Sequence, residues 1–160
     1  MRRAAGPVTP RVTARGLGLG LGLGLGLGLG LGRRHSGQQR HNGGVNPEDL
    51  VAAYLADVSN EADPDRRRTA IERLFDENVR YVDQDGAVDG REDFIRRIDA
   101  LAAMMGPSTR FSLRRPVQHA DDAVLFHWQL GAPGEDPVLA GSDIALVRDG
   151  RISRLYAVLD

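Results

Sequence analysis

The stretch VLAGSDIALVRDGRISRLYAVL, residues 138–159, decides the fold, because it predicts two β-strands joined by a tight turn. Apolar and polar residues alternate on both sides of Asp149-Gly150, and an Asp-Gly pair between two such runs is typical of a β-hairpin. In the first strand Asp143 shares one side with Ala145 and Val147. We predict that this side faces the interior.

Two further strands are predicted before this hairpin, at residues 110–118 and 123–130. Asp121-Asp122 forms a short turn between them, and a longer polar loop covers residues 131–137. Strands joined in this way pair antiparallel, so the C-terminal half of the domain is predicted to be a meander.

Three helices are predicted ahead of the strands, with short extended pieces at 79–83 and 87–89 between the second and third. Asn46-Pro47 and Asp63-Pro64 each combine a capping side chain with a proline suited to the first helical position. The third helix begins near residue 90, with Asp89 as a candidate cap, and ends at Gly106-Pro107. Their apolar stripes are Leu50, Val51, Tyr54, Leu55 and Val58; Ala70, Ile71, Leu74 and Phe75; and Phe94, Ile95, Ile98, Leu101, Ala102 and Met105.

The predicted fold class is therefore α+β. Because the helices must cover one face of the strands, a curved, mixed or antiparallel sheet wraps on three N-terminal helices. Such a cone has an open mouth and an internal pocket.

Residues 1–44 differ in composition from the rest, and we place the domain at 45–160. Between Gly16 and Gly32 glycine and leucine alternate without interruption, which makes ordering costly and is too glycine-rich for a membrane span. Arg33-Arg34 follow where a signal peptide would need small residues for cleavage. We predict a disordered, low-complexity segment. There are two alternative interpretations of this segment: it is sequence upstream of a true start at Val45, or it serves export or membrane contact.

The charge of the domain argues against nucleic acid as a partner. All 22 acidic residues lie at or after Glu48 and 7 of the 21 basic residues precede Val45, so the domain carries 14 − 22 = −8. The chain has no cysteine, no pair of histidines at metal-ligand spacing and no phosphate-binding glycine loop. We predict no metal, no cofactor, no membrane partner and a cytoplasmic location.

Four short segments, taken with the order of the elements, carry a resemblance to a known family. They are NVRYVD at 78–83, VDGRE at 88–92, GSDI at 141–144 and DGRI at 149–152. Over residues 45–160 the chain resembles the SnoaL-like branch of the nuclear transport factor 2-like superfamily. The resemblance implies a cystatin-like cone with a pocket, often a homodimer through the outer face of the sheet. It does not determine function, because this scaffold hosts several enzymes and non-catalytic proteins.

A narrower resemblance to ketosteroid isomerase implies three catalytic residues. Tyr54 matches the hydrogen-bonding tyrosine, Asp83 the carboxylate that shuttles the proton, and Asp143 the protonated acid of the oxyanion hole. The match of Asp143 requires a one-residue gap near residue 149. After Asp83 the chain has Gln84 where that family usually has proline.

The residues themselves leave two interpretations open. A tyrosine on an apolar stripe and an inward mid-strand aspartate need partners, and burial favours the protonated acid. With an ionised Asp83 beside them, they could move a proton next to a carbonyl. In the structural interpretation Asp83 caps the turn at 85–86, Asp143 pairs with Arg80 or Arg154, and Tyr54 is ordinary core.

Further pocket residues are predicted from the third helix and the strands: Phe94, Tyr81, His127 and Trp128. Alternation alone does not show whether His127 or Trp128 faces inward, and an inward His127 could act as a base. The run Arg66-Arg67-Arg68 is predicted to be a solvated helix face.

The leading functional hypothesis is a cofactor-independent isomerase or cyclase acting on a small apolar carbonyl compound, polyketide-like or steroid-like. The first alternative is a non-catalytic ligand-binding or dimerisation domain. The second is an epoxide hydrolase or dehydratase, which would need an Asp-Arg pair or an Asp-His dyad; Arg80 and His127 are the candidates for that role.

Overall fold

The computed structural model describes residues 45–160; the interpretations of residues 1–44 lie outside this part of the chain. The first two predicted helix starts are confirmed, because Asn46 accepts a hydrogen bond from the Glu48 amide at 2.8 Å and Asp63 accepts two from the first turn of its helix. The elements are α1 (Pro47–Tyr54), the π-helix η1 (Leu55–Ser59), α2 (Pro64–Leu74), β1 (Phe75–Asp83), β2 (Gly86–Asp89), α3 (Arg91–Ala103), β3 (Arg110–Leu113), β4 (Gln118–Ala120), β5 (Ala123–Gly131), β6 (Leu139–Arg148) and β7 (Arg151–Leu159).

One mixed sheet contains all seven strands described in residues 45–160, and it confirms the predicted α+β class. Its main order is β2-β1-β7-β6-β5-β3, with β4 paired to β5. All pairs are antiparallel except β1 with β7, which run parallel. The hairpin of β6 and β7 turns at Asp149 and Gly150, both with positive φ, as the Asp-Gly pair predicts.

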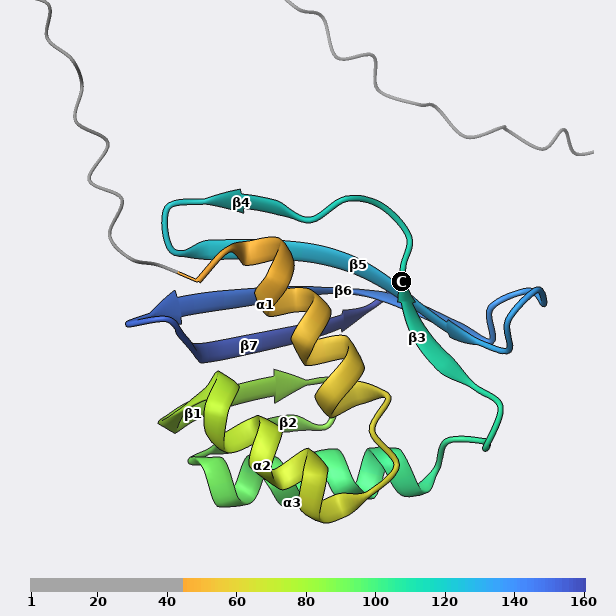
Figure 1. The fold of residues 1–160 in the computed structure, drawn as a ribbon, viewed down its shortest axis with the longest axis horizontal. Helices are drawn as coiled ribbons and strands as arrows, with labels where there is room; N and C mark the ends of the chain where they lie inside the picture. Colours follow the sequence, from red (N-terminus) through yellow and green to blue (C-terminus); the bar gives the residue numbers. More distant parts are fainter. Residues whose placement is uncertain (1–44) are drawn as a thin grey trace, which may run out of the picture. The chain divides into compact units, whose positions relative to one another are not determined.

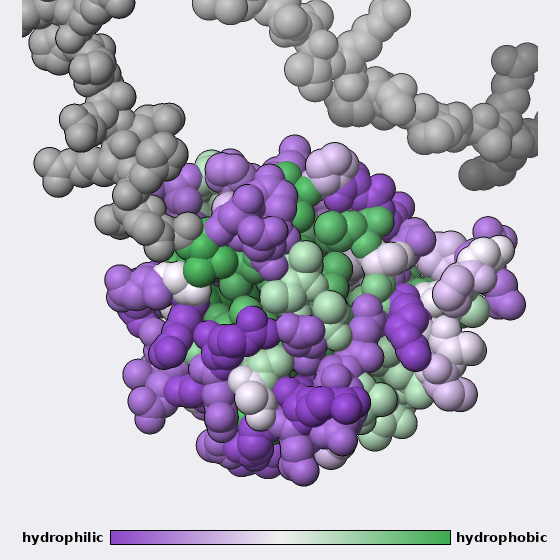
Figure 2. Space-filling view, viewed as in Figure 1, coloured by the Kyte–Doolittle hydropathy of each residue, from purple (hydrophilic) through white to green (hydrophobic). Residues whose placement is uncertain are grey.

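The helices cover one face of this sheet and bury the core against it. In Figure 1, α1 crosses in front of β5, β6 and β7, while α2 and α3 lie beside β1 and β2. Figure 2 shows hydrophilic residues over most of this side, with hydrophobic residues visible between the elements. Among residues 45–160, none of the helices has both the length and the apolar character needed to cross a membrane.

Three boundaries differ from the prediction. Phe75 begins β1 instead of continuing the second helix; its backbone is extended, and its fully buried ring still packs in the core. The expected strand at 110–118 is two strands, β3 and β4, because Pro116 lies between them and has no amide hydrogen for a ladder bond. Gly90, with φ 88°, is the N-cap of α3, whereas Asp89 pairs with Arg80.

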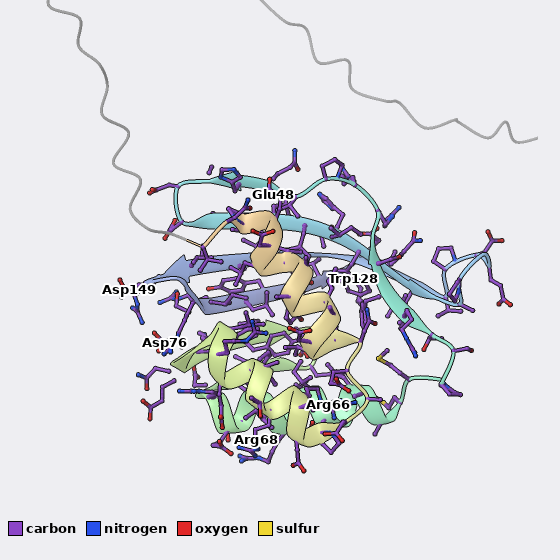
Figure 3. The ribbon with its side chains drawn as sticks, viewed as in Figure 1. Glu48, Arg66, Arg68, Asp76, Trp128 and Asp149 are labelled. Carbon is purple, nitrogen blue, oxygen red and sulfur yellow. The ribbon has the colours of Figure 1, made fainter. Side chains whose placement is uncertain are left out.

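The arginine run on α2 is only partly solvated, so the prediction is wrong for its middle residue. Arg66 and Arg68 lie at the surface (Figure 3), but Arg67 is 4% exposed. Its guanidinium donates to Asp99 on α3 at 2.9 Å and to the carbonyl of Glu61. Arg67 therefore ties α2 to α3 and to the loop between η1 and α2.

Candidate functional site

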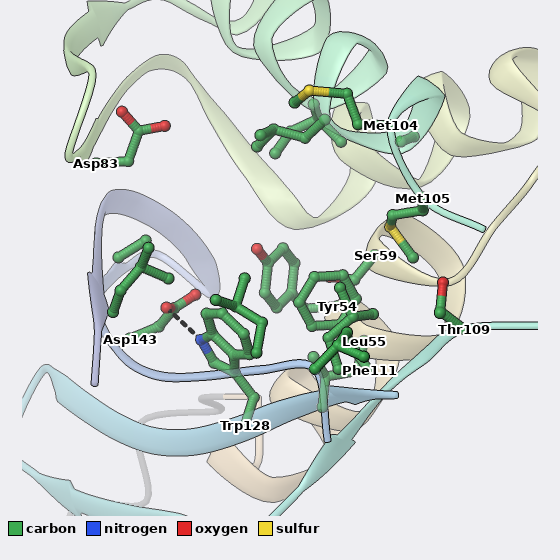
Figure 4. A pocket seen from close by; sticks show the side chains of 18 of the residues that line it. Tyr54, Leu55, Ser59, Asp83, Met104, Met105, Thr109, Phe111, Trp128 and Asp143 are labelled. Atoms are coloured by element: carbon green, nitrogen blue, oxygen red, sulfur yellow. Dashed lines mark hydrogen bonds between the residues drawn. The ribbon is translucent and has the colours of Figure 1, made fainter. Parts of the chain in front are cut away.

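A cavity of about 300 Å³ lies between the helices and the concave side of the sheet. Most of its lining is apolar, and its polar side chains are few. Figure 4 shows Asp83 and Asp143 towards one end of the cavity and Met104 and Met105 towards the other. The lining includes Tyr54, Leu55, Ser59, Tyr81, Asp83, Ile98, Leu101, Met104, Met105, Thr109, Phe111, Trp128, Leu130, Val138, Leu139, Asp143 and Leu159.

Asp143 extends from β6 into the inner end of this cavity and is 3% exposed. Its Oδ1 accepts a hydrogen bond from the indole Nε1 of Trp128 at 2.7 Å (Figure 4). Burial raises the pKa of Asp143 to about 7, and the bond from Trp128 opposes only part of that rise. A carboxyl group that takes up and releases a proton near neutral pH therefore faces the cavity.

Gly141 makes room for the indole that supports Asp143. It lies opposite Trp128 in the β5–β6 register. A Cβ atom at Gly141 would lie 2.6 Å from Cζ2 of the indole and 2.5 Å from the carbonyl oxygen of Val158. Any side chain at this position would thus clash with the backbone of β7 and with the indole that donates to Asp143.

Two phenols complete the polar end. Burial, and next the charge of Asp143, raise the pKa of Tyr54 well above its ordinary value; burial, and next the charge of Asp83, raise the pKa of Tyr81. Both phenols therefore stay protonated at neutral pH and can donate hydrogen bonds. The π-helix η1 follows Tyr54 directly, and its wider turn places Ser59 on the same cavity wall.

Asp83, at the end of β1, has an electrostatic environment unlike that of Asp143. Nη1 of Arg97 on α3 lies 2.9 Å and 3.0 Å from its two carboxylate oxygens, and the amide of Asp85 donates to Oδ1 at 2.9 Å. The Asp83 side chain is 2% exposed and that of Arg97 21%. Among residues 45–160, Asp83 thus has a counter-ion, whereas Asp143 has none.

The structure brings five of the seven predicted site residues to the cavity: Tyr54, Tyr81, Asp83, Trp128 and Asp143. Phe94 and His127 are not among the residues that line it. Phe94 is fully buried behind Tyr81, with ring centroids 5.3 Å apart. His127 points to the outer face of the sheet, where Nδ1 lies 2.7 Å from Oγ of Ser142, because Phe126 and Trp128 occupy the inner side of β5.

The hydrogen-bond partners of the two aspartates match neither sequence interpretation in full. Asp83 does accept from the turn at Asp85, as the structural interpretation expected, yet it also lines the cavity. Asp143 pairs with neither Arg80 nor Arg154; Trp128 is its hydrogen-bond partner among residues 45–160. Within the same residues, no three potential metal ligands of the His, Cys, Asp and Glu types lie together.

Sequence reasoning missed Arg97. On α3 its natural partner would be Asp93, one helical turn earlier, but Asp93 pairs with Arg96 instead. The only available signal was that Arg97 adjoins Ile98 on the buried stripe, which places its side chain at the edge of the covered face.

Solved structures place this architecture in a known fold class. A nuclear transport factor 2-like protein from Cytophaga hutchinsonii matches with a TM-score of 0.54, at 14% identity over 72% of this chain and 91% of that chain. A candidate polyketide cyclase from Sinorhizobium meliloti matches with a TM-score of 0.54, at 22% identity over 68% of this chain and 93% of that one. The domain therefore has the nuclear transport factor 2-like α+β fold.

The family follows from the sequence match. The SnoaL-like domain profile covers residues 51–155, so the chain belongs to the SnoaL-like family. A candidate isomerase of that family from Agrobacterium tumefaciens is 31% identical over 70% of this chain and 95% of its own, with a TM-score of 0.64. No curated protein matches the chain.

Proposed function

We propose that the protein binds a small, mostly apolar carbonyl compound and moves a proton on the carbon beside the carbonyl, as a cofactor-independent isomerase or cyclase. One observation carries this proposal: a phenol and two carboxyl groups with different electrostatic environments face one end of an apolar cavity. Pairs of acids whose environments separate their protonation states are typical of acid-base sites. The similar SnoaL-like protein from Agrobacterium tumefaciens is itself a candidate isomerase.

In the proposed step, Asp83 is the base. Its carboxylate, paired with Arg97, removes a proton from the α-carbon, and the electrons of that C–H bond form a C=C bond while the carbonyl π electrons move to oxygen. Tyr54 and protonated Asp143 donate hydrogen bonds to the enolate oxygen. Return of the proton from Asp83 to a conjugated carbon completes an isomerisation, with no change in oxidation state.

Hydrogen–deuterium exchange tests this step without knowledge of the natural substrate. Apolar ketones and β,γ-unsaturated ketones incubated with the protein in D₂O should exchange their α-protons faster than in buffer alone, as measured by NMR. We expect Asp83→Asn to reduce the catalysed rate about 100-fold or more. Asp85→Asn is the matched control. It removes one negative charge only two residues from Asp83, but the Asp85 side chain is 66% exposed.

Full activity in Asp83→Asn would refute the assigned base. If no ketone in the panel exchanges its α-protons faster with the protein than in buffer alone, proton transfer as the function is refuted. Ligand binding without exchange would then favour the non-catalytic alternative.

A second candidate function is supported by the ion pair of Asp83 and Arg97. A hydrolase acting on an epoxide needs a carboxylate that orients water, held by a basic partner. The sequence interpretation named Arg80 for such a pair, but the structure supplies Arg97 instead. Formation of a diol from styrene oxide, lost in Asp83→Asn and retained in Asp85→Asn, would favour this function over the isomerase.

A homodimer through the outer face of the sheet remains a proposal. Four apolar side chains are in register across neighbouring strands of this face, and Ile144 among them is 41% exposed. An apolar row of this kind is suited to burial against a second copy. Its members are Leu125 on β5, Ile144 on β6, Tyr156 on β7 and Val82 on β1.

A further inference from the structure

The inner end of the cavity combines aromatic rings with carboxyl groups, and none of the described residues that line it is basic. We propose that this end is also a binding site for an organic ammonium cation, with the Asp143 carboxylate as counter-ion and aromatic rings around the charged group. This would be a ligand class separate from the carbonyl compounds proposed above, and it requires no catalysis.

The aromatic rings come from four different elements. Tyr54 from α1, Tyr81 from β1, Phe111 from β3 and Trp128 from β5 all line the cavity. The rings of Phe111 and Trp128 meet edge to face, with centroids 5.1 Å apart, which holds the indole in place. Aromatic faces attract quaternary ammonium groups through the ring quadrupole, and tryptophan and tyrosine do so most strongly.

Asp143 supplies a negative charge that residues 45–160 leave without a counter-ion. Its Oδ1 accepts from Trp128, while no residue of 45–160 donates to Oδ2. Asp83, by contrast, already has Arg97 as its counter-ion. An unpaired buried carboxylate is costly, so a cation from solution that reaches Asp143 gains an interaction that no side chain of the described domain provides. The net charge of −8 on the domain attracts cations towards it.

The two ligand classes require opposite protonation states of the same group. A carbonyl oxygen needs protonated Asp143 as a donor, whereas an ammonium ion needs ionised Asp143. The charged and titratable groups around Asp143 are Tyr54 from α1, Tyr81 and Asp83 from β1, and Arg97 from α3 behind Asp83; the neighbour on β7 is Ala157. Because the pKa of Asp143 is about 7, cation affinity should rise about tenfold per pH unit below that value and level off above it.

Benzyltrimethylammonium and its neutral isostere neopentylbenzene test the site directly. They share shape and volume, and the charge of the first does not titrate, so any pH dependence belongs to the protein. Binding is followed by NMR and by fluorescence of Trp128, the only tryptophan of the chain. At about pH 8.5 we expect the cation to bind at least about tenfold more tightly than neopentylbenzene, and this preference should disappear at about pH 5.5.

Variants separate a specific site from general attraction to an acidic protein. Asp143→Asn should abolish the preference at all pH values, because the amide keeps an acceptor for Trp128 but has no charge. Asp85→Asn should retain it, since its carboxyl is exposed and lies beside Arg97. Equal affinity for the two ligands at high pH, or a preference that survives in Asp143→Asn, would overturn the proposal. Loss of carbonyl exchange in Asp83→Asn would leave the cation site intact, because that substitution removes the proposed base and keeps the Asp143 carboxyl.

Discussion

Replacing Asp143 with asparagine should stabilise the protein at neutral and alkaline pH while leaving it unchanged in acid. Burial raises the pKa of this carboxyl to about 7 from 3.8. Between these values the folded protein holds a proton that the unfolded chain has lost, so the free energy of unfolding decreases as pH rises. Below about pH 4 the group carries no penalty, and above about pH 7 the penalty is complete.

The size of the penalty follows from the same two values. The difference between about 7 and 3.8 corresponds to about 4 kcal/mol, at about 1.36 kcal/mol per pH unit. Asparagine has nearly the same shape, accepts from the Trp128 indole and never ionises. We therefore expect Asp143→Asn to raise the free energy of unfolding by about 2 to 4 kcal/mol at pH 8, and by less than about 0.5 kcal/mol at pH 4.

Urea unfolding followed by far-ultraviolet circular dichroism at several pH values measures this difference. Asp83→Asn provides a contrast of opposite sign, because it removes a carboxylate that Arg97 neutralises and should lower stability by about 1 to 3 kcal/mol. The reasoning is refuted if Asp143→Asn destabilises the protein at pH 8, or if its gain is equal at pH 4 and pH 8.

Three further substitutions test the surroundings of the site. Gly141→Ala should cost about 1 to 3 kcal/mol in urea unfolding and alter Trp128 fluorescence, because its Cβ would overlap the indole. Arg67→Met should cost about 2 to 4 kcal/mol, as the carbonyl of Glu61 loses its donor, whereas Arg66→Met at the surface should change stability by less than about 0.5 kcal/mol. Ile144→Glu should convert the proposed homodimer to a monomer in sedimentation velocity, and an unchanged sedimentation coefficient would argue against that interface.

Local patterns predicted the elements of the fold because capping, periodicity and turn chemistry act within a few residues. Asn46-Pro47 and Asp63-Pro64 begin helices as their side chains require, and Asp149-Gly150 turns the hairpin. Phe75 was assigned to the wrong element because a buried phenylalanine after a helical stripe suits a helix end and a strand start equally well. The inward position of Phe75 was predictable, because its ring faces the core whether the residue ends a helix or begins a strand.

The candidate site depended on the tertiary structure to a greater degree. Alternation placed Asp143 inward and helical spacing placed Tyr54 inward. Alternation could not choose between the two faces of β5, because His127 and Trp128 each fit an inner side; the burial of Phe126 and Trp128 in the core decided it. The pairing of Asp83 with Arg97 joins a strand end to a helix fourteen residues later, and the helix offered Arg97 a closer partner in Asp93.

By itself, then, the amino-acid sequence determined the α+β class, the capped starts of the first two predicted helices, the hairpin and the inward side of Asp143, because each follows from the conformational preferences of neighbouring residues. Only the tertiary structure decided which acid has a counter-ion and which remains alone beside Trp128. The physical reason is that charge pairing and desolvation depend on distances through space between β1, β5, β6 and α3, and the order of residues along the chain does not specify those distances.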